Sequence, residues 1–104
     1  MKTWNVIVTE DVQNDLDNYV YYLLAEKLNE QAARALLDDY DETVDILSGI
    51  AGSLRNLEDP ELSMYKKIRL QRHDYYLLFR IVDDYAIVDR MFHDLQDIDK
   101  ALKS

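Results

Sequence analysis

The chain has 104 residues, 48% hydrophobic and 32% charged, which is typical of one globular domain rather than two cores or a disordered segment. It contains no cysteine, which excludes a disulfide framework, a thiolate metal site and a cysteine nucleophile. A formal net charge of −9 argues against indiscriminate nucleic-acid binding, because the phosphate backbone attracts basic proteins.

The negative charge is unevenly distributed along the chain. Residues 1–62 carry 14 acidic and 4 basic side chains, whereas residues 63–93 carry 6 basic and 4 acidic ones. The basic side chains therefore gather in the second half. We expect a cytoplasmic protein with no membrane partner, because the N-terminus shows no signal-peptide pattern and no apolar run approaches the roughly 20 residues that span a bilayer.

The first half predicts one strand and two helices. Residues 4–8 are apolar and β-branched, as in a short strand, and Thr9 can cap a helix over residues 10–28. Asn29 can cap a second helix. Apolar residues recur in both helices at spacings of three and four, and this predicts an antiparallel helix hairpin. The stripes are Val12, Leu16, Tyr19, Val20, Leu23, Leu24 and Leu28, followed by Ala33, Leu36, Leu37, Tyr40, Val44 and Leu47.

In the second half the apolar period changes from helical spacing to alternation. Strands are predicted at about residues 67–71, 75–82 and 85–92, with tight turns at residues 73–74 and 83–84. Short turns between consecutive strands indicate an antiparallel meander. A further short helix is predicted within residues 94–104.

These elements predict a single α+β domain over residues 1–104. Its order is an N-terminal strand, an antiparallel helix hairpin and a three-stranded antiparallel meander (β-α-α-β-β-β), all in one sheet. The helix hairpin must bury its apolar stripe on one face of this sheet. The opposite face is then left for function.

Three segments together resemble the RelE/ParE toxin superfamily across roughly residues 4–97. They read VIVTEDVQNDLDNYVYYL, AARALLDDYDETVDILSG and YKKIRLQRHDYYLLFRIVDDYAIVDRMFHDLQD. The family commonly shows a basic residue after tyrosine, the pattern Y-x-x-x-Y-R-V, an acidic turn and a strand ending in histidine. This chain departs from that pattern at Phe79, where a second tyrosine is usual, and at residues 94–97, where an arginine-containing segment is common.

The resemblance implies a toxin of a type II toxin–antitoxin system that inhibits growth and is neutralised by a cognate antitoxin. RelE-like members cleave messenger RNA in the ribosomal A site without a metal, whereas ParE-like members poison DNA gyrase. We therefore expect no cofactor and no metal. The ribosome and its messenger RNA are the favoured target, and gyrase is the alternative.

Cleavage by a 2′-hydroxyl needs a base, an acid for the leaving oxygen and cations for the transition state. Arg69 and Arg90 are the predicted phosphate-binding catalytic arginines, since a guanidinium binds phosphate through two donors. His93 is the predicted proton donor, because its unperturbed pKa lies near neutrality and its position matches the family's histidine. The predicted RNA contacts are Lys66, Lys67 and Arg72. Glu58 and Glu61 are the alternatives for the base.

Each of these residues also has an ordinary structural interpretation. Arg69 and Arg90 would be exposed strand arginines paired with Asp89 or Asp94, and the lysines would be a solubilising pair on an edge strand. The acidic face of the second helix (Asp38, Asp39, Asp41, Glu42 and Asp45) is expected to be solvated. Since the net charge of −9 disfavours RNA, gyrase poisoning or a weakened toxin stays close behind messenger RNA cleavage. A non-catalytic protein-binding module on the same fold is a third hypothesis, from a different class.

Overall fold

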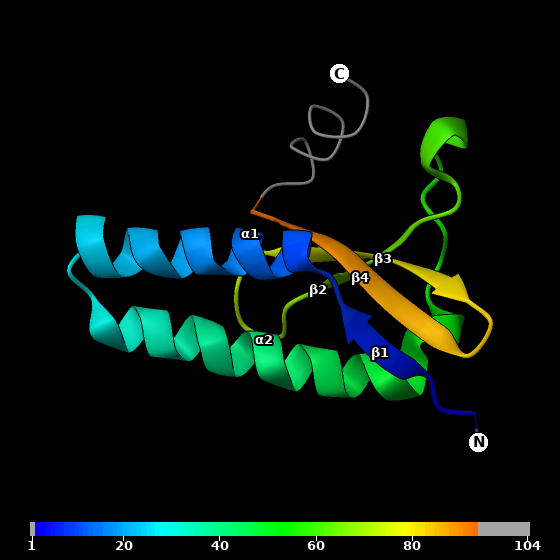
Figure 1. Ribbon diagram of the computed structural model, residues 1–104, viewed down its shortest axis with the longest axis horizontal. Helices are drawn as coiled ribbons and strands as arrows, with labels where there is room; N and C mark the ends of the chain where they lie inside the picture. The colour runs from blue at the N-terminus through cyan, green and yellow to red at the C-terminus, as the bar shows by residue number, and fades with distance from the viewer. Residues whose placement is uncertain (1, 94–104) are drawn as a thin grey trace.

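The computed structural model describes residues 2–93, which form two helices and one four-stranded sheet (Figure 1). The elements are β1 (Asn5–Val8), α1 (Glu10–Tyr21), α2 (Glu30–Ile50), β2 (Lys66–Arg69), β3 (Tyr76–Val82) and β4 (Tyr85–Phe92). Short helical turns connect them at Tyr22–Glu26 (η1), Ala51–Ser53 (η2) and Pro60–Leu62 (η3). The helix predicted within residues 94–104 lies outside the described residues.

The strands follow the order β1-β4-β3-β2. The β2–β3 and β3–β4 pairs are antiparallel, and β1 pairs with β4 in parallel. The α+β class is confirmed and the sheet has four strands, but their order in the sheet differs from the chain order of the predicted N-terminal strand and meander. The helix hairpin connects β1 to β2 at the opposite edge of the sheet, and the meander from β2 through β3 then brings β4 beside β1. The whole segment from α1 to β3 is thus the long connection that two parallel neighbours require.

Both predicted helix starts are confirmed. The side chain of Thr9 accepts a hydrogen bond from the backbone N–H of Val12 at 3.3 Å, and that of Asn29 accepts one from Ala32 at 2.9 Å. These bonds satisfy backbone donors that have no partner within the first helical turn. Each capping residue therefore determines locally where its helix begins.

The first helix is shorter than the predicted residues 10–28. After Tyr21 the chain widens into the π-helical turn η1, and Leu28 then adopts a φ of 49°. The backbone N–H of Asn29 reaches back to the carbonyl of Leu23 at 2.9 Å and closes the turn. Leu28 is 84% exposed and Leu24 is also exposed, so these two residues do not belong to the core. They lie near the hairpin tip, which extends past the sheet (Figure 1).

The helices cover one face of the sheet. Leu16, Leu36 and Leu47 of the helices share a buried cluster with Leu77 and Phe79 of β3. Residues alternate between the two faces of a strand, so Leu78 faces the opposite side. There it packs in a second, smaller cluster whose members are Leu62, Leu78 and Phe92, with Leu57 and Tyr65 against them.

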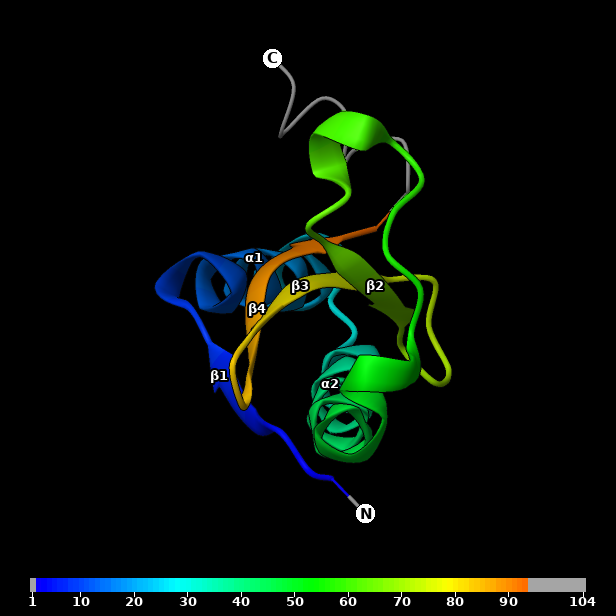
Figure 2. The same cartoon turned by 90° about the vertical axis from the view of Figure 1, so that its right-hand side faces the viewer.

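The segment between α2 and β2 runs along the β2 edge and carries η3 to that second cluster (Figure 2). Leu57 donates its backbone N–H to the carbonyl of Tyr65 at 2.8 Å, and Asn56 bridges to Lys66. This partly covers one edge of the sheet, where unpaired backbone groups would otherwise be exposed. No helix within residues 2–93 is long and apolar enough to cross a bilayer.

Candidate functional site

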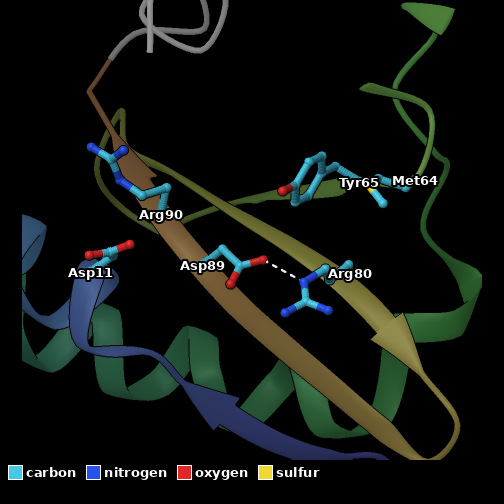
Figure 3. Close-up of a pocket in the computed structure, with 6 residues that line it drawn as sticks. All are labelled: Asp11, Met64, Tyr65, Arg80, Asp89 and Arg90. Carbon is cyan, nitrogen blue, oxygen red and sulfur yellow. Dashed lines mark hydrogen bonds and ion pairs between the residues drawn. The ribbon is translucent and has the colours of Figure 1, made fainter. Parts of the chain in front are cut away.

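The candidate site is the outer face, meaning the sheet face opposite the helices, together with the loop and strand ends that adjoin it. The strand register places two rows of side chains across this face: Lys67, Leu78 and Arg90, and beside them Arg69, Tyr76 and Phe92. A hollow of about 410 Å³ opens on it (Figure 3). Its lining residues are Asp11, Met64, Tyr65, Arg80, Asp89 and Arg90. Cationic, acidic and apolar groups thus meet on one surface.

A bulge in β4 positions one acidic side chain of this hollow. Leu78 pairs with Arg90 while Phe79 pairs with Val88, so Asp89 is an extra residue in its strand. Bulges commonly redirect a side chain next to a functional surface. Here Asp89 accepts a hydrogen bond from Nε of Arg80 at 2.8 Å, and Figure 3 shows the two groups facing each other. Sequence reasoning missed this pair because alternation alone does not reveal a bulge.

Arg90, a predicted catalytic residue, forms a two-donor pair with Asp15 of α1. Its Nε and Nη2 lie 2.8 and 3.2 Å from the carboxylate oxygens of Asp15, and the backbone N–H of Met91 donates to the same carboxylate at 2.9 Å. The hydrogen bond that Arg90 donates to Asp15 raises the pKa of Arg90. Arg90 therefore ties β4 to α1 through Asp15 and not through Asp89, and Asp94 lies outside the described residues.

Replacing Asp15 with alanine is expected to destabilise the fold by about 2 kcal/mol. The substitution leaves the half-buried guanidinium of Arg90 and the N–H of Met91 without their acceptor, and bonds to a charged group contribute more than neutral ones. Urea denaturation monitored by circular dichroism measures the change. Asp17→Ala is the control, since Asp17 is exposed and only accepts a weak bond from Gln13 at 3.4 Å. Equal stabilities of the two variants would contradict this role.

The structure brings the other two predicted catalytic residues to two adjacent residues, Asp74 and Tyr75. Arg69 donates from Nε to Asp74 at 3.2 Å, and its Nη2 donates to the same oxygen. The pKa of Asp74 is lowered chiefly by this hydrogen bond, then by the charge of Arg69, and more weakly by His93 and His73. His93 packs against Tyr75 with ring centroids 4.7 Å apart. We call Arg69, Asp74, Tyr75 and His93 the Arg69–His93 cluster.

The three predicted RNA-binding residues are not brought together. Lys66 points to the helix side, where its ammonium donates to the carbonyl of Leu54 and to Asn56 Oδ1 at 2.8 Å. Arg72 pairs with Glu42 of α2 at 2.6 Å. Lys67 alone lies on the outer face, is exposed, and has no ion pair among residues 2–93.

Asp39 was expected on the solvated face of its helix, and this prediction is wrong. Its residue exposure is 0%, and its carboxylate accepts hydrogen bonds from the backbone N–H groups of Gln71 and Arg72 at 2.9 and 2.8 Å. His73 Nδ1 lies 2.6 Å from the same carboxylate. Burial raises the pKa of Asp39, but the bonds from His73 and the loop backbone outweigh it, so the net shift is downward.

A sequence signal for this burial exists. Asp39 follows Leu36 by three residues and precedes Thr43 by four, and both of those side chains are buried. The carboxylate therefore continues the apolar stripe, where a charged residue needs partners. The Asp39 carboxylate holds residues 71–73 in place by hydrogen bonds, next to Asp74 of the Arg69–His93 cluster.

The two alternatives for the general base lie in the segment before β2. Glu58 lines a second hollow of about 360 Å³ with Arg55, Asn56, Leu57 and Lys67. Glu61 lies in η3, where its backbone N–H donates to the side chain of Asp59. Within residues 2–93 no three His, Asp or Glu side chains converge in a group that could hold a metal ion.

The sequence matches no family model and no curated protein. The structure, in contrast, is similar to several solved structures. A chain of the chromosomal ParDE toxin–antitoxin system from P. aeruginosa has a TM-score of 0.69 and 20% identity, with 86% of this chain and 95% of that chain covered. A chain of the RelBE2 toxin–antitoxin complex from Mycobacterium tuberculosis has a TM-score of 0.63 and 21% identity, with 90% and 94% covered.

A third similar structure is that of the E. coli DinJ–YafQ toxin–antitoxin complex, with a TM-score of 0.56 and 10% identity over 98% of this chain and 99% of the matched chain. These likenesses span nearly the whole of each chain, so the shared feature is the complete fold and not one motif. The likenesses confirm the fold that the predicted resemblance implies.

Proposed function

We propose that this chain is the toxin of a type II toxin–antitoxin pair and that a cognate antitoxin keeps it inactive by covering the outer face. The likeness of its complete fold to chains of the ParDE, RelBE2 and DinJ–YafQ toxin–antitoxin systems supports the role. The composition of the outer face supports an antitoxin as the binding partner, because this face combines arginines with the apolar cluster around Leu78 and Phe92. A segment with acidic and apolar side chains complements such a surface.

For the activity, we propose metal-independent cleavage of messenger RNA on the ribosome. Arg69 holds the scissile phosphate, and His93 gives a proton to the leaving oxygen. The observation that carries this assignment is that Arg69 pairs with Asp74 while His93 packs on Tyr75, the next residue along the chain. Both members of the Arg69–Asp74 pair are largely exposed, and exposed ion pairs are weak, so a phosphate can displace the carboxylate.

The remaining predicted residues take supporting roles in the same proposal. Arg90 adds positive charge at the end of β4, beyond its bond to Asp15. Lys67 contacts the RNA backbone from the outer face, and Lys66 and Arg72 contact it after leaving their present partners. Each of these exchanges replaces a hydrogen bond within the chain by one to phosphate.

A second candidate activity is non-catalytic poisoning of DNA gyrase. One observation favours it: four arginines on or near the sheet, Arg69, Arg72, Arg80 and Arg90, already have carboxylate partners within the chain. With a net charge of −9, the chain then offers RNA few uncompensated cations. The non-catalytic protein-binding module is the third hypothesis, and it predicts no toxicity.

Controlled expression in a bacterial host, followed by primer extension on a translated message, separates these candidates. We expect growth arrest and new cuts in the message, and we expect Arg69→Ala and His93→Ala each to lower the cleavage at least a hundredfold, the typical contribution of a positioned acid or charge-stabilising donor. Arg34→Ala is the control, because its exposed pair with Glu30 lies within α2, and it should cut like the parent.

Arrest without cuts would move the assignment to gyrase, which supercoiling assays then test. Cuts that persist in both variants would remove Arg69 and His93 from the mechanism. Absence of growth arrest would not affect the fold assignment and would favour the non-catalytic protein-binding module. Arg90→Ala is unsuitable as the main test, because loss of the Asp15 pair also weakens the fold.

A further inference from the structure

Nearly every arginine of this chain has an acidic partner. Five of the six arginines in the sequence form ion pairs, which are Arg34–Glu30, Arg69–Asp74, Arg72–Glu42, Arg80–Asp89 and Arg90–Asp15. Arg55 is the exception: it is exposed and has no ion pair with any residue from 2 to 93. In a chain with 21 acidic residues, an arginine without a partner stands out.

The lysines show the same pattern. Lys2 pairs with Asp84, Lys27 lies over the ring of Tyr22, and Lys66 donates to Asn56 and the loop backbone. Among the lysines in the described part of the chain, only Lys67 has no such partner. Arg55 and Lys67 line the same hollow of about 360 Å³, so the two unpaired cations meet at one place.

We propose that this hollow, between Arg55 and Lys67, binds a carboxylate side chain of a partner peptide and serves as a subsite for the antitoxin. The inference rests on the proposed function, because it names the chemistry by which that partner is recognised. Guanidinium and ammonium groups are donors without acceptor capacity, so two of them around one hollow favour an oxyanion. A carboxylate can accept two hydrogen bonds from the guanidinium of Arg55 and one from the ammonium of Lys67 at the same time.

The other lining residues favour a peptide over a nucleic acid. Glu58 lies in the same hollow and repels an extended phosphate backbone, whereas a peptide can present a basic or neutral side chain to it. Leu57 is half-buried against the apolar cluster of Leu62, Leu78 and Phe92. It offers a contact for an apolar side chain next to the acidic one.

The position of the Arg55–Lys67 hollow on the sheet also supports a peptide as the partner. Lys67 lies beside Leu78 in the strand register, and Leu78 lies beside Arg90 at the hollow of Figure 3. A single extended segment can therefore run from the Arg55–Lys67 hollow across the apolar cluster towards the site proposed for catalysis. Binding at the hollow would direct an inhibitory segment over that site.

The test is a nuclear magnetic resonance titration of the isotope-labelled full chain with three probes. These are a short peptide of alternating glutamate and leucine, the same peptide with glutamine for glutamate, and a short oligouridylate. We expect the glutamate peptide to shift the Nε–H signal of Arg55 and the amide signal of Lys67. The variant carrying both Arg55→Gln and Lys67→Gln is expected to bind it about tenfold more weakly, as for the loss of charge-assisted hydrogen bonds.

Arg34→Gln is the matched control, because it removes an equally exposed arginine far from the hollow and should bind like the parent. Equal binding of the glutamine peptide, or no shift at Arg55 and Lys67, would overturn the proposal. Tighter binding of oligouridylate at the same signals would also overturn it and assign the hollow to RNA. The titration measures binding and not growth, so its outcome is independent of whether the chain arrests cells.

Discussion

Replacing Asp39 with alanine is expected to destabilise the fold by about 3 kcal/mol. The fully buried carboxylate accepts hydrogen bonds from the backbone N–H groups of Gln71 and Arg72 and contacts Nδ1 of His73. Alanine leaves these donors without an acceptor inside the protein. Urea denaturation of the variant, monitored by circular dichroism, measures the loss of unfolding free energy.

Asp38→Ala is the matched control, since Asp38 is exposed at the neighbouring position, and it should change stability by less than about 0.5 kcal/mol. Asp39→Ala as stable as Asp38→Ala would show that the loop does not depend on this carboxylate. We also expect the nuclear magnetic resonance spectrum of Asp39→Ala to lose chemical-shift dispersion mainly at residues 71–74. The hydrogen bonds that the substitution removes are those that position this loop.

Asp39 is also expected to account for part of the loss of folding stability at low pH. Folding lowers the pKa of Asp39 below its ordinary value of 3.8, despite the opposing effect of burial, through its bonds to His73 and the loop backbone. A group with a lowered folded pKa stabilises the protein above its unfolded pKa, and this contribution is lost as the pH falls through the folded pKa. Asp39→Asn should therefore show a shallower loss of stability than the parent below about pH 4.

Replacing Gly52 with alanine is expected to cost about 2 kcal/mol, which is typical of overpacking. A Cβ at this position would overlap the ring of Trp4, which packs against the main core cluster. Trp4 also donates its backbone N–H to the carbonyl of Ser48 at 2.8 Å, so the residue cannot move away without disturbing the entry to β1. Thermal unfolding of the variant, monitored by the fluorescence of this single tryptophan, measures the effect.

Gly49 provides a control of opposite sign. It lies inside α2, and a Cβ built there meets nothing within 4 Å. Gly49→Ala should therefore stabilise the protein by about 1 kcal/mol, because alanine is the better helix former. If Gly52→Ala were stabilising as well, the close approach of Trp4 would be contradicted.

The local elements were predictable because their signals are short in sequence. Thr9 and Asn29 each bond to a backbone N–H three residues away, so their capping roles can be recognised without the fold. Alternation in the second half likewise indicated strands: β4 has the predicted bounds, whereas both ends of β2 and the start of β3 differ from the prediction by one or two residues. The π-helical turn η1 was not predicted, because its i to i−5 hydrogen bond leaves no pattern distinct from the end of an α-helix.

The candidate site was predictable in its residue types but not in its partners. Arg69 was selected because a guanidinium can hold a phosphate, and His93 because it is a proton donor that matches the family's histidine. The structure adds Asp74 as the partner of Arg69 and Tyr75 as the ring against which His93 packs. Arg90 was selected in the same way, yet its partner Asp15 is 75 positions away in the sequence. No periodicity connects residues at that separation.

By itself the sequence determined the class of the fold, the helix starts, the strand segments and the resemblance to the RelE/ParE toxins, since each depends on neighbours within a few positions. Only the tertiary structure decided that β1 lies beside β4, that Asp39 is buried, and which carboxylate neutralises each arginine. Those outcomes depend on contacts between distant segments, where burial and charge pairing are set by the packing of the helices on the sheet. The same packing left Arg55 and Lys67 as the arginine and the lysine of the described chain without an acidic, amide or aromatic partner, and it placed them at one hollow.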